Sequence, residues 1–203
     1  MNKKEIALLA SLVLTTVISV LSGQIYEAET IRANTLRLHI IANSDSAADQ
    51  QQKLYIRDKL LEMEDILPDN AQNIDHALSV VRGNLPVIEK RINTLLKNSG
   101  AEYGASCSIE NYYFDTTEYS DFILPQGEYT ALTVRLGKAE GRNWWCVMYP
   151  ALCSTSCGEI ALENSSSFIK VQRPAMRFKV VEIYEELKNK LKTNTAEKYD
   201  HTG

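Results

Sequence analysis

The sequence has no long run of basic residues, and its 203 residues carry a formal net charge of −4. Binding to nucleic acid or to an anionic membrane surface needs clustered lysine and arginine side chains that neutralise phosphates. This absence therefore argues against nucleic acid as a partner. Internal repeats and low-complexity tracts are also lacking, and a hydrophobic content of 44% is enough for a core. We expect one α/β domain with tails, or at most two small domains.

Side chains that bind metal ions are scarce, because the chain has only three histidines and four cysteines. The histidines His39, His76 and His201 are scattered, and the spacing of Cys153 and Cys157 is irregular for a zinc site. A glycine-rich phosphate loop and a serine nucleophile elbow are absent as well. We therefore expect no metal and no cofactor.

An apolar run at the N-terminus is the first strong feature that is present. Lys3 and Lys4 precede an uncharged apolar stretch from Ile6 to Leu21, and small residues follow it. This pattern predicts that residues 1–23 form a secretory signal peptide or an uncleaved signal anchor. A buried N-terminal helix is disfavoured, because the stretch is apolar on every face. Since no second apolar run follows, we expect the chain to meet the membrane only through this segment.

The rest of the chain divides into five segments. We predict a polar linker over 24–35, an exported domain over 36–157, a loop region over 158–177, an amphipathic helix over 178–191 and a frayed tail over 192–203. The helix has one apolar stripe, formed by Val180, Ile183, Tyr184, Leu187 and Leu191. This stripe can pack back on the domain or bind a partner.

The first part of the domain is expected to hold one strand and three helices. Residues 36–42 alternate apolar and polar side chains, which predicts a strand. Ser46 and Asp49 resemble a capping box, so a helix should begin directly after Ser46. Apolar residues at helical spacing then predict a second helix that stops at Gly83 and a third that starts at Pro86.

The second part of the domain changes to a period of two, which is typical of strands. We predict strands over 105–115, 129–136 and 144–149, an irregular connection over 116–127, and a hairpin turn over 137–142. The expected fold is therefore a single α+β domain with the order β-α-α-α-β-β-β. Its sheet should be four-stranded, mainly antiparallel and packed by helices.

Residues 141–153, GRNWWCVMYPALC, hold both tryptophans of the chain and two of its cysteines. Trp144 and Trp145 alternate across the strand, so one ring should enter the core while the other points outward as a candidate partner contact. Alternatively, the C-terminal tail covers both rings. Outside the cytoplasm disulfides persist, and Cys146 and Cys153 can close a small loop that contains a proline. A catalytic thiol at Cys146 is disfavoured, because apolar neighbours raise the pKa of a thiol.

Ser44, Asp45 and His39 invite comparison with a catalytic triad. However, His39 alternates with apolar residues in the predicted strand, which is typical of a half-exposed structural histidine. Ser44 and Asp45 fall in a predicted helix cap, where the helix dipole favours negative charge. We expect no catalysis from this cluster.

Two blocks of the sequence resemble the stage II sporulation protein R family. The first block is LRLHIIANSDS at 36–46, with DQ at 49–50 and IRD at 56–58. The second consists of LPQGEY at 124–129, LG at 136–137, GRNWWCV at 141–147 and PALC at 150–153. The resemblance covers roughly residues 36–153, with the blocks in the family's order.

This resemblance implies a signalling protein of endospore-forming bacteria, made in the forespore and exported toward the septal intermembrane space. There it would activate a membrane-embedded aspartic protease of the mother cell, which removes the pro-sequence of sigma-E. The resemblance thus implies an activator and not an enzyme. Within the two blocks, we take five residues as candidate partner contacts: Asn43, Ser44, Asp45, Trp144 and Trp145.

Cys107 and Cys157 look like additions to the family's usual cysteine pair, so Cys146–Cys153 is the first expected disulfide. Pairing of Cys153 with Cys157, or of Cys107 with Cys157, stays open. One alternative function is a secreted septal or cell-wall hydrolase that uses Asp45 or Cys146. Another is a purely structural septal protein.

Overall fold

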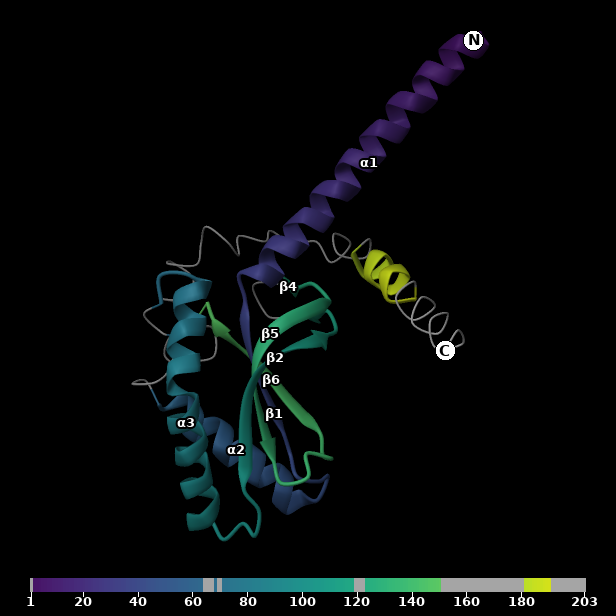
Figure 1. The fold of residues 1–203 in the computed structure, drawn as a ribbon. Helices are drawn as coiled ribbons and strands as arrows, with labels where there is room; N and C mark the ends of the chain where they lie inside the picture. The colour runs from purple at the N-terminus through teal and green to yellow at the C-terminus, as the bar shows by residue number, and fades with distance from the viewer. Residues whose placement is uncertain (1, 64–67, 69–70, 119–122, 151–180, 191–203) are drawn as a thin grey trace, which may run out of the picture. The chain divides into compact units, whose positions relative to one another are not determined.

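The computed structural model describes residues 2–63, 68, 71–118, 123–150 and 181–190 (Figure 1). The chain divides into two compact units, which we describe separately. The sheet unit comprises residues 33–113 and 128–169, and the α1 unit comprises residues 1–32, 114–127 and 170–203.

The sheet unit is an α+β layer structure. Its elements are β1 (Leu36–Ile41), α2 (Ala47–Leu61), α3 (Ile74–Asn98), β2 (Ala105–Phe114), β5 (Gly127–Leu136) and β6 (Asn143–Tyr149). The four strands form one sheet in the order β2-β5-β1-β6. β1 runs parallel to β5 and antiparallel to β6, and the sheet is mainly antiparallel. The expected α+β class and four-stranded sheet are therefore confirmed.

The strand order corrects one expectation. The sequence predicts that residues 129–136 and 144–149 form a hairpin, but β1 lies between β5 and β6. Five of the six residues of β1 are buried, which is typical of a strand at the centre of a sheet. The loop at 137–142 therefore spans two strand spacings, about 10 Å, and leaves room for β1. A turn signal alone does not distinguish this connection from a hairpin.

The helix that follows β1 begins as predicted. Ser46 has extended backbone angles, and its Oγ accepts a hydrogen bond of 3.1 Å from the Asp49 N–H. This contact satisfies one of the amide groups that a helix start leaves without an intrahelical partner. The predicted cap of α2 is thus confirmed.

The second and third predicted helices are one continuous helix, α3. Asn73 caps its start, and the helix then runs through Gly83 and Pro86. A proline inside a helix removes one hydrogen bond and costs about 3 kcal/mol. The fully buried side chains of Val81 and Ile88, which lie on either side of Pro86, offset this cost by packing against the sheet.

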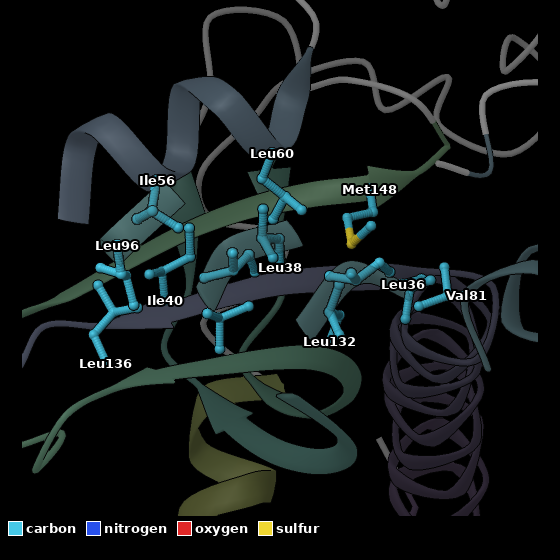
Figure 2. Packing of buried hydrophobic residues seen from close by; sticks show 13 residues of the cluster. Leu36, Leu38, Ile40, Ile56, Leu60, Val81, Leu96, Leu132, Leu136 and Met148 are labelled. Atoms are coloured by element: carbon cyan, nitrogen blue, oxygen red, sulfur yellow. The ribbon is translucent and has the colours of Figure 1, made fainter. Parts of the chain in front are cut away.

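The hydrophobic core lies between one face of the sheet and the two helices (Figure 2). Alternate residues of each strand point into it, as the period of two requires. Its main members are Leu36, Leu38 and Ile40 of β1, Ile56 and Leu60 of α2, Val81, Ile88, Ile92 and Leu96 of α3, Leu132, Val134 and Leu136 of β5, and Met148 of β6. Residues between them on the strands face the other side of the sheet.

The α1 unit contains α1 (Lys3–Ala33), the antiparallel pair β3 (Thr117–Glu118) and β4 (Ile123–Leu124), and a C-terminal helix over 181–190. Among the described residues, α1 is the one helix long and apolar enough to cross a membrane. This helix is compatible with a signal peptide or an anchor. The segment 24–35, predicted as a linker, is helical as far as Ala33.

The C-terminal helix is present, but it packs through an unexpected face. Its described part, residues 181–190, exposes 59% of Ile183 and 56% of Leu187, although both belong to the predicted apolar stripe. Instead, Val181 and Glu185 are buried. Arg32 of α1 explains this orientation, because its guanidinium is itself buried and donates to the Glu185 carboxylate at 3.2 Å. The predicted loop at 158–177 and tail at 192–203 lie outside the described residues.

Candidate functional site

The end of β1 binds the loop that joins β5 to β6, so the structure brings the two sequence blocks together. Four backbone N–H groups of this loop donate to Ala42, Asn43 and Asp45. The Gly141 N–H donates to the Ala42 carbonyl at 2.9 Å, and the Lys138 N–H to the Asn43 Oδ1 at 2.9 Å. The other two are Glu140 N–H to the Asn43 carbonyl at 3.2 Å and Arg142 N–H to the Asp45 Oδ1 at 2.7 Å. Residues 42–45 of the first block therefore fix the conformation of the loop at 137–142, which belongs to the second block.

Two glycines of the loop permit this close approach. A Cβ at Gly141 would lie 2.2 Å from the Ser44 carbonyl oxygen, and a Cβ at Gly137 would lie 2.1 Å from the Asn43 Oδ1. Gly137 also has a φ of +55°, a conformation that side chains disfavour. Both positions thus require glycine.

Asp49, on the first turn of α2, is the centre of a hydrogen-bond network. Its carboxylate accepts from the Ser44 hydroxyl, from the Asn43 amide at 2.9 Å and from the Tyr103 hydroxyl at 2.6 Å. These bonds, chiefly that from Ser44, lower the pKa of Asp49 to about 2. Burial, followed by the bond to Asp49, raises the pKa of Tyr103 well above its usual range. The carboxylate therefore stays ionised. Its hydrogen bonds link α2 to Tyr103 and to Asn43 and Ser44, which follow β1.

Lys53 of α2 also binds the loop at 137–142. Its ammonium is almost fully buried and donates to the Gln50 Oε1 at 2.8 Å and to the Arg142 carbonyl at 2.9 Å. The Gln50 amide in turn donates to the Ser44 carbonyl at 2.9 Å. Burial lowers the pKa of Lys53. A buried ammonium is tolerated here because backbone and side-chain oxygens accept its protons.

The sheet face opposite the core carries a second cluster, built from aromatic and polar side chains. His39 stacks on Trp145 with ring centroids 3.7 Å apart and meets Tyr112 edge-on at 4.5 Å. Its Nε2 lies 3.1 Å from the Asn143 Oδ1. The half-exposed position expected for His39 is wrong, because the side chain is fully buried. This burial lowers its pKa to about 4, so the imidazole is neutral at physiological pH.

Two arginines extend this cluster along the same face. Arg37 is fully buried, with its guanidinium 5.2 Å from the centre of the Tyr129 ring. Arg135 forms an ion pair with Glu110 and donates to the Ser108 hydroxyl at 2.9 Å. The face thus combines cations with aromatic rings, an arrangement that favours cation–π contacts.

The two tryptophans point to opposite faces of the sheet, as the alternation predicts. Trp144 packs against the core residues, and the Arg57 guanidinium lies 5.3 Å from the centre of its ring. Trp145 stacks on His39. Both rings are half-buried. Their role as partner contacts therefore stays a prediction.

The three members of the supposed triad each bind a different group. His39 pairs with Asn143, and the Ser44 hydroxyl donates to Asp49. Asp45 accepts from the Arg142 N–H at the protein surface. In the described part of the chain, no group of three or more histidine, cysteine, aspartate or glutamate side chains is arranged to hold a metal ion.

Among the described cysteines, Cys107 is a free thiol, and Cys157 lies outside the described residues. Burial, followed by the charge of Glu89, raises its pKa to about 12 and makes it a poor nucleophile. Cys146 lies opposite Leu38 of β1 and packs against the core. Cys153 and Cys157 lie outside the described residues, so the Cys146–Cys153 bond stays a prediction.

Comparison with known proteins decides the family. The sequence model of stage II sporulation protein R matches residues 32–159, which include both blocks and the whole sheet. The chain belongs to the stage II sporulation protein R family. Stage II sporulation protein R of Bacillus subtilis (strain 168) is 37% identical over 118 residues, which is 58% of this chain and 53% of that protein. The chain thus aligns with about half the length of this relative. No solved structure matches the chain.

Several residues that shape this site are not predicted from the sequence. The sequence predicts Asp49 as part of a helix cap and of the first block but not as the centre of a network, and neither Tyr103 nor Lys53 is among the candidate site residues. Tyr103 lies 54 residues from Asp49 in the chain, so no local pattern could connect them. For Lys53, its position on the buried stripe of α2, three residues before Ile56, was a usable signal.

Proposed function

We propose that this protein is an exported signal of sporulation that acts by binding. Its target would be a membrane-embedded aspartic protease of the mother cell, and activation of that protease would lead to removal of the pro-sequence from sigma-E. The site of action would be the septal intermembrane space, to which the forespore exports the protein.

The observation that carries this proposal is the family match over residues 32–159. The geometry of the site supports a role in binding. The most distinctive residues of both blocks hold one loop in a fixed shape, and a preorganised surface loses little entropy when it meets a partner. The exposed side chain of Arg142 lies on that loop, that of Asp45 lies beside it between β1 and α2, and both are accessible for contact.

The first experiment is a deletion of the gene followed by immunoblotting of sigma-E during sporulation. Pro-sigma-E should accumulate in the deletion strain, and the intact gene supplied in trans should restore the shortened form. Normal processing without the gene would refute the proposal.

Substitution of Asp45, which forms an exposed ion pair with Arg142, tests whether the partner binds at this surface. Asp45→Asn keeps the acceptor for the Arg142 N–H but removes the charge that a partner would meet. We expect roughly tenfold less processing from a lost charged contact, with an unchanged circular dichroism spectrum. Glu140→Gln removes the same charge from an exposed residue of the adjacent loop at 137–142 and is the matched control. Equal processing by both variants would exclude Asp45 as a contact.

The alternative hydrolase predicts a different result for the same protein. If Asp45 or Cys146 acts in catalysis, the purified chain should degrade septal peptidoglycan, and Asp45→Asn or Cys146→Ser should abolish this activity. Our proposal predicts no such activity in the intact chain. A peptide map under non-reducing conditions checks the Cys146–Cys153 bond in the same preparation.

A further inference from the structure

The C-terminal helix of the α1 unit turns its apolar residues outward. Val181 and Glu185 are buried. Ile183 and Leu187 lie on the opposite side of the helix and are more than half exposed, and Tyr184 beside them is also exposed. A helix that packs in water has the reverse arrangement, with its apolar stripe against protein and its charged side chains outside. The outer face of this helix is therefore suited to an apolar environment.

The helix α1 fixes where this face lies relative to a membrane. The stretch from Ile6 to Tyr26 carries no charged side chain and is about 30 Å long at 1.5 Å per residue, which matches the hydrocarbon thickness of a bilayer. Lys3 and Lys4 precede this stretch, and basic residues stay on the cytoplasmic side. Tyr26 is 76% exposed at the opposite end, and aromatic side chains favour the membrane interface. When α1 spans the bilayer, the residues after Tyr26 thus emerge on the outer side.

The C-terminal helix contacts α1 within two turns of this exit point. Glu29 lies about 5 Å beyond Tyr26 along the helix axis, and its carboxylate is 4.0 Å from the Lys188 ammonium. Arg32 lies about 9 Å beyond Tyr26 and forms the buried ion pair with Glu185. The headgroup layer on each side of a bilayer is about 5–7 Å thick. These contacts therefore hold the C-terminal helix at the level of the headgroups, where interfacial helices bury their apolar faces.

We propose that α1 remains in the membrane as an uncleaved anchor and that the C-terminal helix lies on the outer leaflet, with Ile183, Tyr184 and Leu187 inserted among the lipids. Lipid is the occupant that the position favours, because this face is held beside the point where α1 leaves the bilayer. The contact adds to the span of residues 1–23, which the sequence predicts as the chain's only contact with the membrane. The inference goes beyond the proposed function and shares with it only the export of the chain.

Insertion of three side chains gives weak membrane binding by itself, and the tether through α1 makes it sufficient. Because both helices belong to one chain, the second contact is intramolecular and its effective concentration is high. Charge contributes little, since residues 181–190 contain three glutamates and two lysines. Lys190, at the edge of the face, can place its aliphatic stem in the lipid and its ammonium among the headgroups. The contact therefore depends on apolar area, and we expect it on an uncharged lipid surface.

Depth measurements on the full chain in phosphatidylcholine vesicles test this inference without any partner protein. A ketone-bearing amino acid at one position per variant is coupled to a nitroxide, which leaves the cysteines unlabelled. The labelled positions are Ile183 and Leu187 on the apolar face, Glu186 at its edge, and Leu14 in the middle of α1. Electron paramagnetic resonance then compares collisions of the nitroxide with oxygen, which enters lipid, and with a polar nickel chelate, which stays in water.

We expect the ratio of oxygen to nickel collisions at Ile183 and Leu187 to exceed that at Glu186 by about threefold or more, because polar solutes are excluded from apolar surroundings. Leu14 should give the highest ratio. Leu187→Gln removes apolar area from the face and should lower the ratio at Ile183 by roughly twofold or more. Glu186→Gln introduces the same residue at the edge of the face and should leave that ratio unchanged. Circular dichroism checks that both variants fold.

Equal, low ratios at the three positions of the C-terminal helix would overturn the inference, because the apolar face would then lie in water. Low collision rates with both reagents at Ile183 and Leu187 would also overturn it, since protein would then cover the face. A low ratio at Leu14 would show that α1 does not span the bilayer. Mass spectrometry of the mature chain from sporulating cells tests the anchor in its natural setting, and loss of residues 1–23 would refute it.

Sigma-E immunoblots of the deletion strain separate these failures from failure of the proposed function. If processing needs the gene but the apolar face lies in water, only the membrane contact is refuted. If processing does not need the gene, the proposed function fails, whatever depth the nitroxides report.

Discussion

His39 is the residue whose burial has the clearest consequence for pH dependence. Burial lowers its pKa from 6.5 to about 4, so between these values the unfolded chain binds a proton that the folded chain does not. Stability is therefore complete above about pH 6.5 and decreases as the pH falls toward 4. We expect the free energy of unfolding to be about 2 kcal/mol lower at about pH 5 than at about pH 7.5.

His39→Phe keeps a ring between Trp145 and Tyr112 but cannot take up a proton. This variant should lose most of the pH dependence in that window. Asp49 does not interfere, because its lowered pKa makes it contribute only below about pH 4. Urea unfolding followed by tryptophan fluorescence at both pH values is the measurement. An equal pH dependence in both proteins would contradict the assignment to His39.

Gly141 gives a second prediction at the scale of one residue. Gly141→Ala places a Cβ 2.2 Å from the Ser44 carbonyl oxygen, so the backbone of one block must shift. We expect a loss of about 1–3 kcal/mol in the free energy of unfolding, as for other overpacked sites.

Gly83→Ala is the matched control for this prediction. Gly83 lies inside α3, and a Cβ there would meet no atom within 4 Å. Alanine should stabilise the helix by about 0.5–1 kcal/mol, because glycine is the weaker helix former. The two substitutions should thus shift the urea midpoint in opposite directions. A midpoint that Gly141→Ala leaves unchanged or raises would show that the loop has room for a side chain.

At the scale of elements, the C-terminal helix depends on one buried ion pair. Arg32 and Glu185 are both nearly inaccessible to water, and Arg32 also donates to the Gln126 carbonyl at 2.8 Å. Glu185→Gln removes the buried carboxylate from Arg32 and leaves it only the more exposed Glu29 carboxylate at 3.3 Å, so we expect a cost of about 3 kcal/mol. Glu186→Gln removes the same charge from an exposed neighbour and should have little effect.

Hydrogen exchange of residues 181–190 measures this difference. Because 1.4 kcal/mol corresponds to a factor of ten, Glu185→Gln should lower the protection of the helix by roughly a hundredfold. Glu186→Gln should leave the protection near that of the unchanged chain. Equal protection in the two variants would mean that the ion pair does not hold the helix.

The elements show how far the sequence determines the fold. The strands and the Ser46 cap follow from local spacing, and the structure confirms them. The position of β1 between β5 and β6 does not follow, because it depends on burial of β1 across the whole sheet. Similarly, the glycine and proline that suggested a break in α3 are overridden by a continuous apolar stripe that packs on the sheet.

The sequence predicts the candidate site only in part, because the contacts of this site are also not local in the chain. The residues of the two blocks were visible as an unusual sequence, but their contacts join segments about 100 residues apart. No period or spacing encodes such a contact. The buried face of the C-terminal helix does not follow from hydropathy, because a glutamate such as Glu185 is normally exposed. Here Glu185 is buried because it forms an ion pair with the buried Arg32.

At the scale of the whole molecule, the chain contains an N-terminal apolar helix and a sheet unit whose loop at 137–142 is held in a fixed shape by the two sequence blocks. The central claim is that such a molecule triggers a protease by contact from outside the cytoplasm. In the proposed function, the apolar helix α1 directs export and the sheet unit makes the contact.

Co-expression in a bacterium that does not sporulate tests this claim most directly. The cells contain the protease and pro-sigma-E, with this chain either absent, complete, or shortened by residues 1–23. The account predicts that the immunoblot shows shortened sigma-E only with the complete chain, because only that form reaches the outer side of the membrane. Equal processing without the chain, or with the form that lacks residues 1–23, would contradict it.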